Sequence, residues 1–486
     1  MKNTIPIFFA INEEYIDHCC TSIVSILENN RYLNISIYIL TDYISLESKE
    51  LLQEIENVFT CVTIQWEIID SESFKQLKKK GGYITEHTLY RYAIADLFPN
   101  LDKALYLDAD LVINGSIEPL WELDLEGYYC AGVDDIFIRR INYRKILELA
   151  EKDVYINAGV LLLNLKDLRK DKIQEKLLQH TSIYINRDRY QDQDAINCIC
   201  KGKIKLIPNI YNFTTSETLH TPEMLSDIII IHYTGSIKPW HQEYTWQVLK
   251  ELYCKYNSSM NKIKNRLLSR WMERTIEFFQ LSQKTNDTEL EEEADKLLNK
   301  IIDHCSLAVP ITYENGLCGI GTGIEYLLQK KLVEGNSDEI LHQIDSAVYS
   351  VIEQKSLTDL GLGKGVSGLA YYFYSRLCTR ENFNTPTALK IKEYLFHLIN
   401  WIAELLPDTN NRPVLCEVYL VLSLLHELNI PQAPIETLMR NSLSQITGYS
   451  AATNTYIKIR NLSVSGHIHY FSFTTINAGF NSSFKG

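Results

Sequence analysis

The sequence contains no run of about 18 apolar residues, which is the length that a membrane-spanning helix needs. Its first residues, MKNTIPIFFAINEEY, lack the basic start, the long apolar core and the small-residue cleavage site of a secretory signal peptide. We therefore expect a cytoplasmic protein that is neither secreted nor inserted into a membrane.

The sequence also lacks an excess of positive charge and a framework of paired cysteines. It has 48 Lys and Arg against 61 Asp and Glu, and the net charge of −13 argues against binding to nucleic acid. The 11 cysteines are scattered and odd in number, so we expect buried free thiols rather than disulfides. Cys198 and Cys200 have no second Cys or His pair near them, which favours an apolar helix over a zinc site. The cysteines in apolar surroundings include Cys61, Cys130, Cys254 and Cys378.

Two domains are expected, because 486 residues exceed what a single hydrophobic core usually supports. Up to about residue 250, apolar strand-like runs alternate with periodic helix-like segments. Strands are expected over 5–10, 35–40 and 62–69, and helices over 15–28 and 46–58, the second with Ser45 as N-cap. This alternation predicts a parallel sheet covered by helices, in which ligands bind at the carboxyl ends of the strands.

The stretch KALYLDADLVING, residues 103–115, contains the first candidate site. Asp108 and Asp110 follow a buried apolar run, and side chains two residues apart in an extended segment lie on the same side. Neighbouring carboxylates repel each other unless a cation lies between them, and Mg²⁺ or Mn²⁺ prefers such oxygen ligands. A polar strand end or turn would explain the same residues, so this stretch alone leaves both interpretations open.

The stretch IIIIHYTGSIKPWH supplies further candidate ligands. A single histidine after a strand is more often structural, but His232 is followed by Gly235, which permits close backbone approach, and by the cation Lys238. A neutral imidazole would complete a metal shell with two aspartates, and the ammonium would offset charge on a departing diphosphate.

Three more stretches contain polar residues that fit a ligand site. Arg91, on a predicted helix leading to the two aspartates, is either a surface arginine or a ligand of a phosphate or a carboxylate. Asn157 interrupts an apolar run, so its amide either bonds to the backbone or faces a ligand. Asp192, Gln193 and Asp194 open a predicted helix, where the aspartates either cap the helix or bind sugar hydroxyls.

The second half of the chain reads differently. Residues 255–274 contain six basic residues and one acid, which predicts a linker helix on the first domain or peripheral contact with an anionic membrane. Beyond about residue 290 the patterns are helical. Gly316 and Gly323 are followed 45 residues later by Gly361 and Gly368, which predicts stacked helical hairpins. From about residue 451, alternating apolar residues favour an irregular β-like tail.

In this order, over roughly residues 4–250, YLDADLVI, INAGVLLLNL, YQDQDAIN and HYTGSIKPWH resemble the motifs of the family 8 glycosyltransferases. The resemblance implies a retaining hexosyltransferase with an α/β Rossmann-like fold of GT-A type. It implies UDP-glucose or UDP-galactose as donor, Mn²⁺ or Mg²⁺ as metal, and a glycan or peptide acceptor. The metal ligands implied are Asp108, Asp110 and His232, and the catalytic residues are Gln193, Asp192, Asn157 and Lys238. The donor-binding residues implied are Ala10, Asn12, Tyr15, Tyr83, Arg91, Asp108, Ala109, Asp110, Asp134, Gly235 and Lys238.

The resemblance also implies details of chemistry. The acceptor hydroxyl would attack the anomeric carbon from the face that UDP leaves, or a covalent intermediate would form on Gln193 or a nearby carboxylate. Tyr15 would stack on uracil. Asn12 stands where the family often has an aspartate and Glu14 where a neutral amide is common, so the uracil contacts depart from the family pattern more than the metal site does.

The stretches GLCGIGTGIEYLL and GLGKGVSGLAYYF resemble repeats of the lanthionine synthetase C-like α/α toroids, over roughly residues 290–450. Cyclases of that family bind Zn²⁺ through a Trp-Cys and a later Cys-His pair, and neither pair stands here. We therefore expect a partial, metal-free toroid that presents the acceptor. The domains expected are a glycosyltransferase domain over 1–254, a basic linker helix over 255–288 and a helical domain over 289–486. The alternatives are a catalytically silent scaffold or peptide-binding module, and a cyclase in the second domain.

Overall fold

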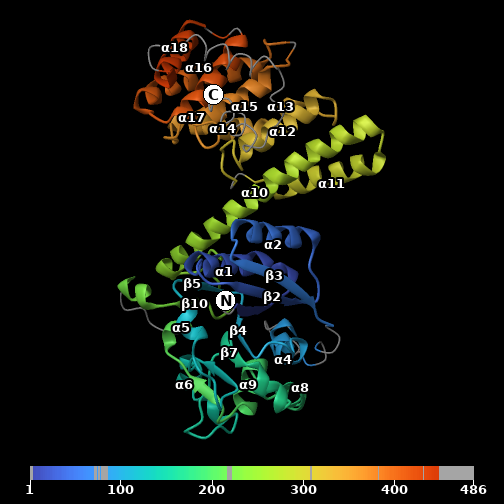
Figure 1. The fold of residues 1–486 in the computed structure, drawn as a ribbon, viewed down its shortest axis with the longest axis vertical. Helices are drawn as coiled ribbons and strands as arrows, with labels where there is room; N and C mark the ends of the chain where they lie inside the picture. Colours follow the sequence, from blue (N-terminus) through green and yellow to red (C-terminus); the bar gives the residue numbers. More distant parts are fainter. Residues whose placement is uncertain are drawn as a thin grey trace. The chain divides into compact units, whose positions relative to one another are not determined.

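The computed structural model describes residues 4–70, 74, 77, 86–215, 222–306, 309–380, 382–428, 430 and 432–447. Contacts within the chain define two compact units, Met1–Lys264 and Asn265–Gly486 (Figure 1). The predicted donor-binding residue Tyr83 and the predicted β-like tail lie outside the described residues.

A seven-stranded sheet, in the order β3-β2-β1-β4-β7-β6-β8, forms the centre of the N-terminal unit. β1 pairs in parallel with β2 and β4, and β2 with β3, as the alternating pattern predicted. β7 instead pairs antiparallel with β4 and β6, so the expectation of a purely parallel sheet was wrong for this strand. Between β4 and β7 the chain passes through β5, β6 and short helices only, so the alternation of strands and long helices on which the expectation rested does not continue here. The strands are β1 (Ile5–Ala10), β2 (Ile35–Thr41), β3 (Val62–Ile68), β4 (Lys103–Leu107), β6 (Cys130–Gly132), β7 (Val160–Asn164) and β8 (Ile204–Leu206).

Apolar residues dominate the central strands β1, β4 and β7, as expected for a sheet that is covered on both faces. In β1, IPIFFA, every residue except Ala10 is buried. The predicted helices over 15–28 and 46–58 are confirmed as α1 and α2, and the hydroxyl of Ser45 accepts the N–H of Ser48 at 3.1 Å as the predicted N-cap. The helices of this unit are η1 (Glu13–Tyr15), α1 (Ile16–Asn29), α2 (Leu46–Val58), η2 (Glu86–Ala93), α4 (Ile94–Leu97), α5 (Glu118–Trp121), α6 (Ile136–Arg140), η3 (Tyr143–Lys145), α7 (Leu165–Lys170), α8 (Ile173–Tyr184), α9 (Gln191–Ile199), η4 (Asn209–Tyr211) and η5 (Pro222–Asp227).

A smaller sheet of three strands, in the order β5-β10-β9, lies in the same unit. Its strands are β5 (Leu111–Ile113), β9 (Phe213–Thr214) and β10 (Ile230–His232). β5 follows β4 after three residues, so the chain passes from the large sheet into the small one at the two aspartates.

Helices and turns make up the described part of the C-terminal unit, as predicted. Three helical hairpins can be distinguished: α12 with α14, α15 with α16, and α17 with α18. The first helices of the hairpins, α12, α15 and α17, pack side by side in that order, so the hairpins are stacked. The helices are α10 (Gln247–Thr285, which begins in the first unit), α11 (Thr288–His304), α12 (Leu317–Gln329), α13 (Ser337–Ile340), α14 (His342–Gln354), α15 (Val366–Leu377), α16 (Pro386–Leu405), η6 (Leu406–Asp408), α17 (Arg412–Glu427) and α18 (Gln432–Thr447).

The glycine repeat is real, but its period differs from the predicted 45 residues. Gly316 is the N-cap of α12 and Gly365 is the N-cap of α15, 49 residues later. The N–H groups that follow them donate to carbonyls seven residues earlier, from Leu317 to Pro310 and from Val366 to Asp359. Equivalent turns, rather than equal sequence spacing, therefore define the repeat.

All 11 cysteines are free, as predicted, but two of them are exposed rather than buried. Cys254 lies on the exposed side of α10 and Cys378 is the C-cap of α15. Apolar neighbours along a helix point to other faces, which is why apolar sequence surroundings did not ensure burial.

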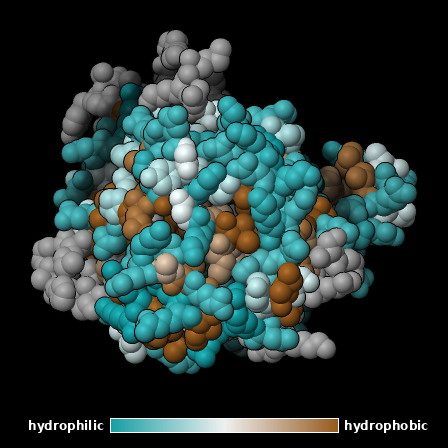
Figure 2. Space-filling view, turned by 90° about the horizontal axis from the view of Figure 1, so that it is seen from below, coloured by the Kyte–Doolittle hydropathy of each residue, from teal (hydrophilic) through white to brown (hydrophobic). Residues whose placement is uncertain are grey.

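The surface in Figure 2 is hydrophilic over most of the area shown, with hydrophobic residues in small groups between the hydrophilic ones. Across the described ranges, no helix is both long enough and apolar enough to pass through a membrane.

Candidate active site

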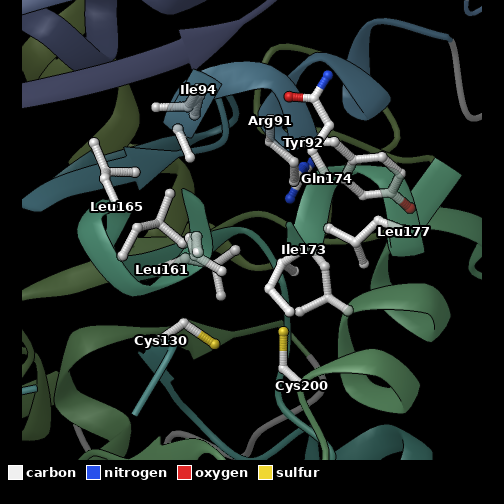
Figure 3. Close-up of a pocket in the computed structure, with 14 residues that line it drawn as sticks. Arg91, Tyr92, Ile94, Cys130, Leu161, Leu165, Ile173, Gln174, Leu177 and Cys200 are labelled. Atoms are coloured by element: carbon white, nitrogen blue, oxygen red, sulfur yellow. The ribbon is translucent and has the colours of Figure 1, made fainter. Parts of the chain in front are cut away.

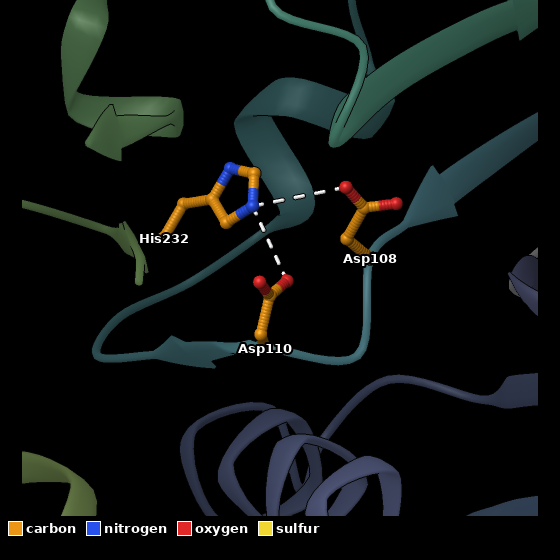
Figure 4. A group of neighbouring side chains, drawn as sticks. All are labelled: Asp108, Asp110 and His232. Carbon is orange, nitrogen blue, oxygen red and sulfur yellow. Dashed lines mark ion pairs between the residues drawn. The ribbon is translucent and has the colours of Figure 1, made fainter. Parts of the chain in front are cut away.

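The pairing of the small sheet brings the predicted metal ligands together. Asp108 and Asp110 lie in the connection between β4 and β5, and β10 pairs antiparallel with β5 so that His232 stands opposite Leu111. Residues more than a hundred positions apart in the chain thus meet at the carboxyl end of β4 (Figure 4).

The geometry of the three ligands suits a divalent cation. One ligand atom from each of Asp108, Asp110 and His232 lies within 4.8 Å of the others. The Nε2 atom of His232 lies 3.2 Å from Oδ1 of Asp110 and 3.7 Å from Oδ2 of Asp108. Two carboxylate oxygens and one imidazole nitrogen fit Mn²⁺ or Mg²⁺. Within the described ranges, no other cluster of three or more His, Cys, Asp and Glu side chains has the spacing of a metal site.

Lys238 is a direct neighbour of this group. Its ammonium donates to Oδ2 of Asp110 and, at 2.7 Å, to the carbonyl of Tyr233. Burial disfavours the charged form of Asp110, but Lys238 and His232 outweigh it and hold the pKa of that carboxyl well below its ordinary value. Asp110 is therefore an anion at neutral pH.

Arg91 is buried at the other side of Asp108, on the 3-10 helix η2 rather than on an α-helix. Its Nη2 atom donates to Oδ1 of Asp108 at 3.0 Å, and its Nε atom lies 3.2 Å from Oδ2 of Asp192. The guanidinium carbon lies 4.2 Å from the ring centre of Tyr106. Burial raises the pKa of Asp192 to about 6, although Arg91 opposes this shift. Arg91 thus connects two predicted site residues and is not a surface arginine.

Asn157 and Gln193 share a carboxylate on the next wall of the cavity. The side-chain N–H groups of Asn157 and Gln193 donate to Oδ2 of Asp135 at 3.3 and 3.1 Å. Oε1 of Gln193 accepts the N–H of Ala158 at 3.0 Å, so both ends of this amide are bonded.

The carboxylate on this wall belongs to Asp135 and not to the predicted Asp134. Asp134 is not among the residues that line the cavity, and its carboxylate pairs with Arg139 at 3.0 Å. Asp135 is the N-cap of α6 and accepts the N–H of Ile138 at 3.1 Å, which fixes its side chain at the cavity wall. Two consecutive aspartates look equivalent in a sequence, and only the start of the helix distinguishes them.

Asp192 and Asp194 have different surroundings, although they lie only two positions apart in the sequence. Asp194 is fully buried and accepts from the hydroxyls of Tyr143 and Tyr155 and from the N–H of Tyr190. It holds the start of α9, whereas Asp192 lines the cavity.

Aromatic residues form the end of the site beside β1. The ring of Tyr15 meets the ring of Trp240 edge-on at 6.1 Å, and Trp240 stacks on His18 at 3.6 Å. Gly235 has a φ of +90°, a conformation that L side chains rarely adopt, so a glycine is needed at this turn.

These walls enclose a cavity of about 620 Å³. It is large enough for a drug-sized or cofactor-sized ligand, whose pockets usually measure about 300–1,000 Å³. The predicted site residues that line it are Ala10, Asn12, Tyr15, Arg91, Asp108, Ala109, Asp110, Asn157, Asp192, Gln193, His232, Gly235 and Lys238.

A second cavity, of about 40 Å³, lies behind Arg91 and is lined mainly by apolar side chains and by the thiols of Cys130 and Cys200 (Figure 3). Its volume fits at most a few water molecules. The larger, polar cavity is therefore the candidate active site.

Sequence reasoning missed three residues of this site. Asp135 was missed because the neighbouring Asp134 was predicted in its place. Asn212 is fully buried, and its Oδ1 lies 3.0 Å from Nδ1 of His232. Gly159 packs so closely that a Cβ atom there would lie 2.2 Å from Cε1 of His232 and 2.7 Å from Oδ2 of Asp108. A glycine two residues after the polar Asn157, in an otherwise apolar run, was the one signal available for this close packing.

Comparison with known proteins gives a consistent result for the N-terminal unit. The family model described as glycosyl transferase family 8 matches residues 6–244. A putative glycosyltransferase of Haemophilus influenzae is 34% identical over 249 residues, covering 50% of this chain and 74% of that protein. A lipopolysaccharide 1,2-glucosyltransferase of Escherichia coli is 33% identical over 256 residues, covering 49% and 74%. A lipopolysaccharide 1,3-galactosyltransferase of Salmonella typhimurium is 26% identical over 247 residues, covering 48% and 72%.

Each of these matches covers about half of this chain. The family model ends at residue 244, before the helical unit. The resemblance of that unit to the lanthionine synthetase C-like toroids stays a prediction.

Proposed function

The chain belongs to glycosyl transferase family 8 and is a hexosyltransferase, and we propose that it moves glucose or galactose from a UDP-sugar to an acceptor hydroxyl with retention of configuration. The donor, the metal ion and the acceptor are the parts of this proposal that go beyond family membership.

One observation carries the proposal. Asp108, Asp110 and His232 converge at one end of a cavity of about 620 Å³ that also contains a buried ammonium, Lys238. A nucleotide diphosphate needs this combination, because a divalent cation and a nearby ammonium together balance the charge of two phosphates. A catalytically silent scaffold would have no use for it.

The metal supplies Lewis-acid stabilisation of the departing diphosphate when it is bound by Asp108, Asp110 and His232. Lys238 is held beside Asp110 by the carbonyl of Tyr233, within reach of the same phosphates. Gly235 removes any side chain from the turn before Lys238, so backbone N–H groups can approach a phosphate closely.

The nucleoside is assigned to the end of the cavity formed by Ala10, Asn12 and Tyr15. The ring of Tyr15 is supported edge-on by Trp240, which leaves it suited to stack on a flat base. Trp240 lies only two positions after Lys238, so the same short segment would contact both the base and the diphosphate.

The hexose is assigned to the wall made by Asp135, Asn157, Asp192 and Gln193. Carboxylates and amides in hydrogen-bonding distance of one another present fixed acceptors and donors for sugar hydroxyls. Asp135 replaces Asp134 in this role because its carboxylate lines the cavity.

Retention by attack from the leaving-group face fits Gln193 better than a covalent intermediate does. Oε1 of Gln193, the atom that would act as nucleophile, already accepts the N–H of Ala158. Its amide nitrogen donates to Asp135 and to the hydroxyl of Tyr155 at 3.2 Å. A side chain hydrogen-bonded at both ends is held in place and can position the sugar, and the Ala158 N–H already uses one of the two lone pairs on its oxygen.

We assign acceptor presentation, for a glycan or a peptide, to the helical unit. Its stacked hairpins are the architecture expected from the toroid resemblance. We also propose a cytoplasmic location with peripheral membrane contact through residues 255–274. The basic residues of this segment that are exposed on α10 are Lys255, Lys262, Arg266, Arg270 and Arg274.

Release of UDP tests the proposal. Purified protein is incubated with UDP-glucose, UDP-galactose or UDP-N-acetylglucosamine, with Mn²⁺ or with EDTA, and UDP is measured with and without candidate acceptors. We expect Mn²⁺-dependent release from UDP-glucose or UDP-galactose, and loss of at least 100-fold in Asp110→Ala, in keeping with the removal of a metal ligand. Asp102→Ala, which removes an exposed carboxylate of the same unit, is the matched control. Equal activity in EDTA, or in Asp110→Ala, would overturn the proposal.

A further inference from the structure

We propose that Asn212 is a positioning residue that keeps the proton of His232 on Nδ1, so that the Nε2 lone pair faces Asp108 and Asp110. The inference rests on the proposed metal-dependent function. It concerns a residue that does not itself line the cavity but contacts two residues that do, Asn157 and His232.

A buried chain of hydrogen bonds carries the proposal. The N–H of Gly159 donates to Oδ1 of Asn157 at 3.0 Å, and Nδ2 of Asn212 donates to the same oxygen at 2.9 Å. Oδ1 of Asn212 then lies 3.0 Å from Nδ1 of His232. Asn212 is fully buried and His232 nearly so, so water does not replace any of these partners.

The backbone N–H of Gly159, the first donor in this series of hydrogen bonds, fixes the direction of every later bond. Because the Gly159 N–H can only donate, the atom of Asn157 that faces it is the carbonyl oxygen. That oxygen cannot donate, so the atom of Asn212 that faces it is the NH₂ group. The carbonyl oxygen of Asn212 is therefore turned to His232, and Nδ1 of the imidazole has to carry a proton.

The consequence appears at the opposite ring nitrogen. A neutral imidazole with its proton on Nδ1 has a lone pair on Nε2, and Nε2 is the atom that lies 3.2 Å from Asp110 and 3.7 Å from Asp108. With the other tautomer, an N–H group would point into the space between the carboxylates and exclude a cation. The orienting of a metal-binding histidine by its second nitrogen is a general requirement.

The same chain reaches the sugar wall. The side-chain NH₂ group of Asn157 donates to Oδ2 of Asp135 at 3.3 Å. The nitrogen of the Asn157 amide therefore contacts Asp135 on the hexose wall. Its oxygen orients the amide of Asn212, which in turn sets the nitrogen of His232 that carries the proton. A substitution at Asn157 should weaken metal binding even though Asn157 is no metal ligand.

The tautomer can be read without any metal. Full-length protein labelled with ¹⁵N-histidine, metal-free at pH 8, is examined by long-range ¹H–¹⁵N correlation, and the His232 signals are assigned by their loss in His232→Gln. We expect Nδ1 to carry a proton in the wild type, whether or not Nε2 carries a second one for the Asp110 carboxylate 3.2 Å away. In Asn212→Leu we expect a mixture of tautomers or a shift to protonated Nε2. Asn212→Asp loses the N–H donated to Asn157 but keeps an acceptor for Nδ1–H, so Nδ1 should stay protonated.

Affinity for Mn²⁺, measured by electron paramagnetic resonance of the free ion, gives the second readout. We expect Asn212→Leu to weaken binding by about 10–100-fold, the usual effect of losing such a support, and Asn212→Asp to stay within a few-fold of wild type. Asn30→Leu is the matched control, because Asn30 is another fully buried amide that accepts the N–H of Ile117 at 3.0 Å and donates to Ile26 at 2.9 Å. It should leave Mn²⁺ affinity unchanged.

Two results would overturn the inference. One is a wild-type His232 with its neutral-state proton on Nε2, a measurement that does not depend on any variant folding. The other is an Asn212→Leu protein that is folded and binds Mn²⁺ as tightly as the wild type. If the wild type has the expected tautomer but binds no Mn²⁺, then the proposed metal-dependent function fails and the positioning role of Asn212 stands.

Discussion

Gly159 gives the most demanding test of the metal site, because the smallest possible side chain should disable it. A Cβ atom at this position would lie 2.2 Å from Cε1 of His232, where ordinary contacts begin at 3.4 Å, so the ring has to move by about 1.2 Å. The ring is only 3% exposed and is bonded to Asn212 behind it, so it has little room to move without breaking that bond.

The expected magnitudes follow from this displacement. Metal–ligand distances tolerate about 0.2 Å, so a shift of about 1.2 Å removes His232 from the shell. Misplacement of a reacting group by about 1 Å costs on the order of 100-fold in rate. We therefore expect Gly159→Ala to lower kcat/KM by about 100-fold and to weaken Mn²⁺ binding by at least about 10-fold. Overpacking should also lower the free energy of unfolding by about 1–3 kcal/mol.

The assay has to separate loss of the metal from loss of the fold. Mn²⁺ binding and UDP release are measured at 20 °C, with circular dichroism and Tm on the same samples. Gly115→Ala is the control, because Gly115 lies just beyond β5 and the close contact of its Cβ, at 2.6 Å, would be with the flexible end of Ile229. It should lose a similar amount of stability and keep Mn²⁺ binding. A folded Gly159→Ala protein with wild-type Mn²⁺ affinity would refute the reasoning.

Three further predictions concern other parts of the N-terminal unit. Asp135→Asn should lower kcat/KM for the donor by at least about 10-fold while Asp134→Asn changes it less than about 3-fold, because only the first carboxylate lines the cavity; equal effects would return the role to Asp134. In metal-free protein, the pKa of Asp192 is about 6 in the folded state and near 4 in the unfolded chain. Between these values the folded state holds a proton that the unfolded chain has released, so the contribution of Asp192 should lower Tm as pH rises from 4 to 6. Asp192→Asn should remove that part of the fall, and a parallel Tm profile for the variant would contradict the assignment. Ser45→Ala should lower the free energy of unfolding by about 1 kcal/mol through loss of the N-cap, measured by urea titration, whereas Thr63→Ala at an exposed strand position should change it by less than about 0.5 kcal/mol.

Local patterns predicted the elements of the fold well, because their signals are local. The apolar run IPIFFA and the serine before α2 each contain, within a few residues, the information that makes a buried strand or a helix start. The direction of β7 was beyond such reasoning, since strand pairing depends on how the intervening chain turns and not on the strand itself. The repeat period was wrong for a related reason, as the helix-start turns at Gly316 and Gly365 are defined by hydrogen bonds rather than by composition.

For the site, the sequence by itself determined which residue types were available and the edge of the sheet at which they would meet. Two aspartates after β4, a histidine at the end of β10 and a lysine after it are residue types that can bind a metal ion and a diphosphate, and polar groups collect at strand ends. Tertiary structure alone decided that β5 and β10 pair in the register that places His232 opposite Leu111. It also placed Asp135 rather than Asp134 at the cavity wall, left no room for a side chain at Gly159, and put Asn212 behind the imidazole. These choices rest on distances of a few ångströms between residues far apart in the chain, and such distances arise only when the sheets pack.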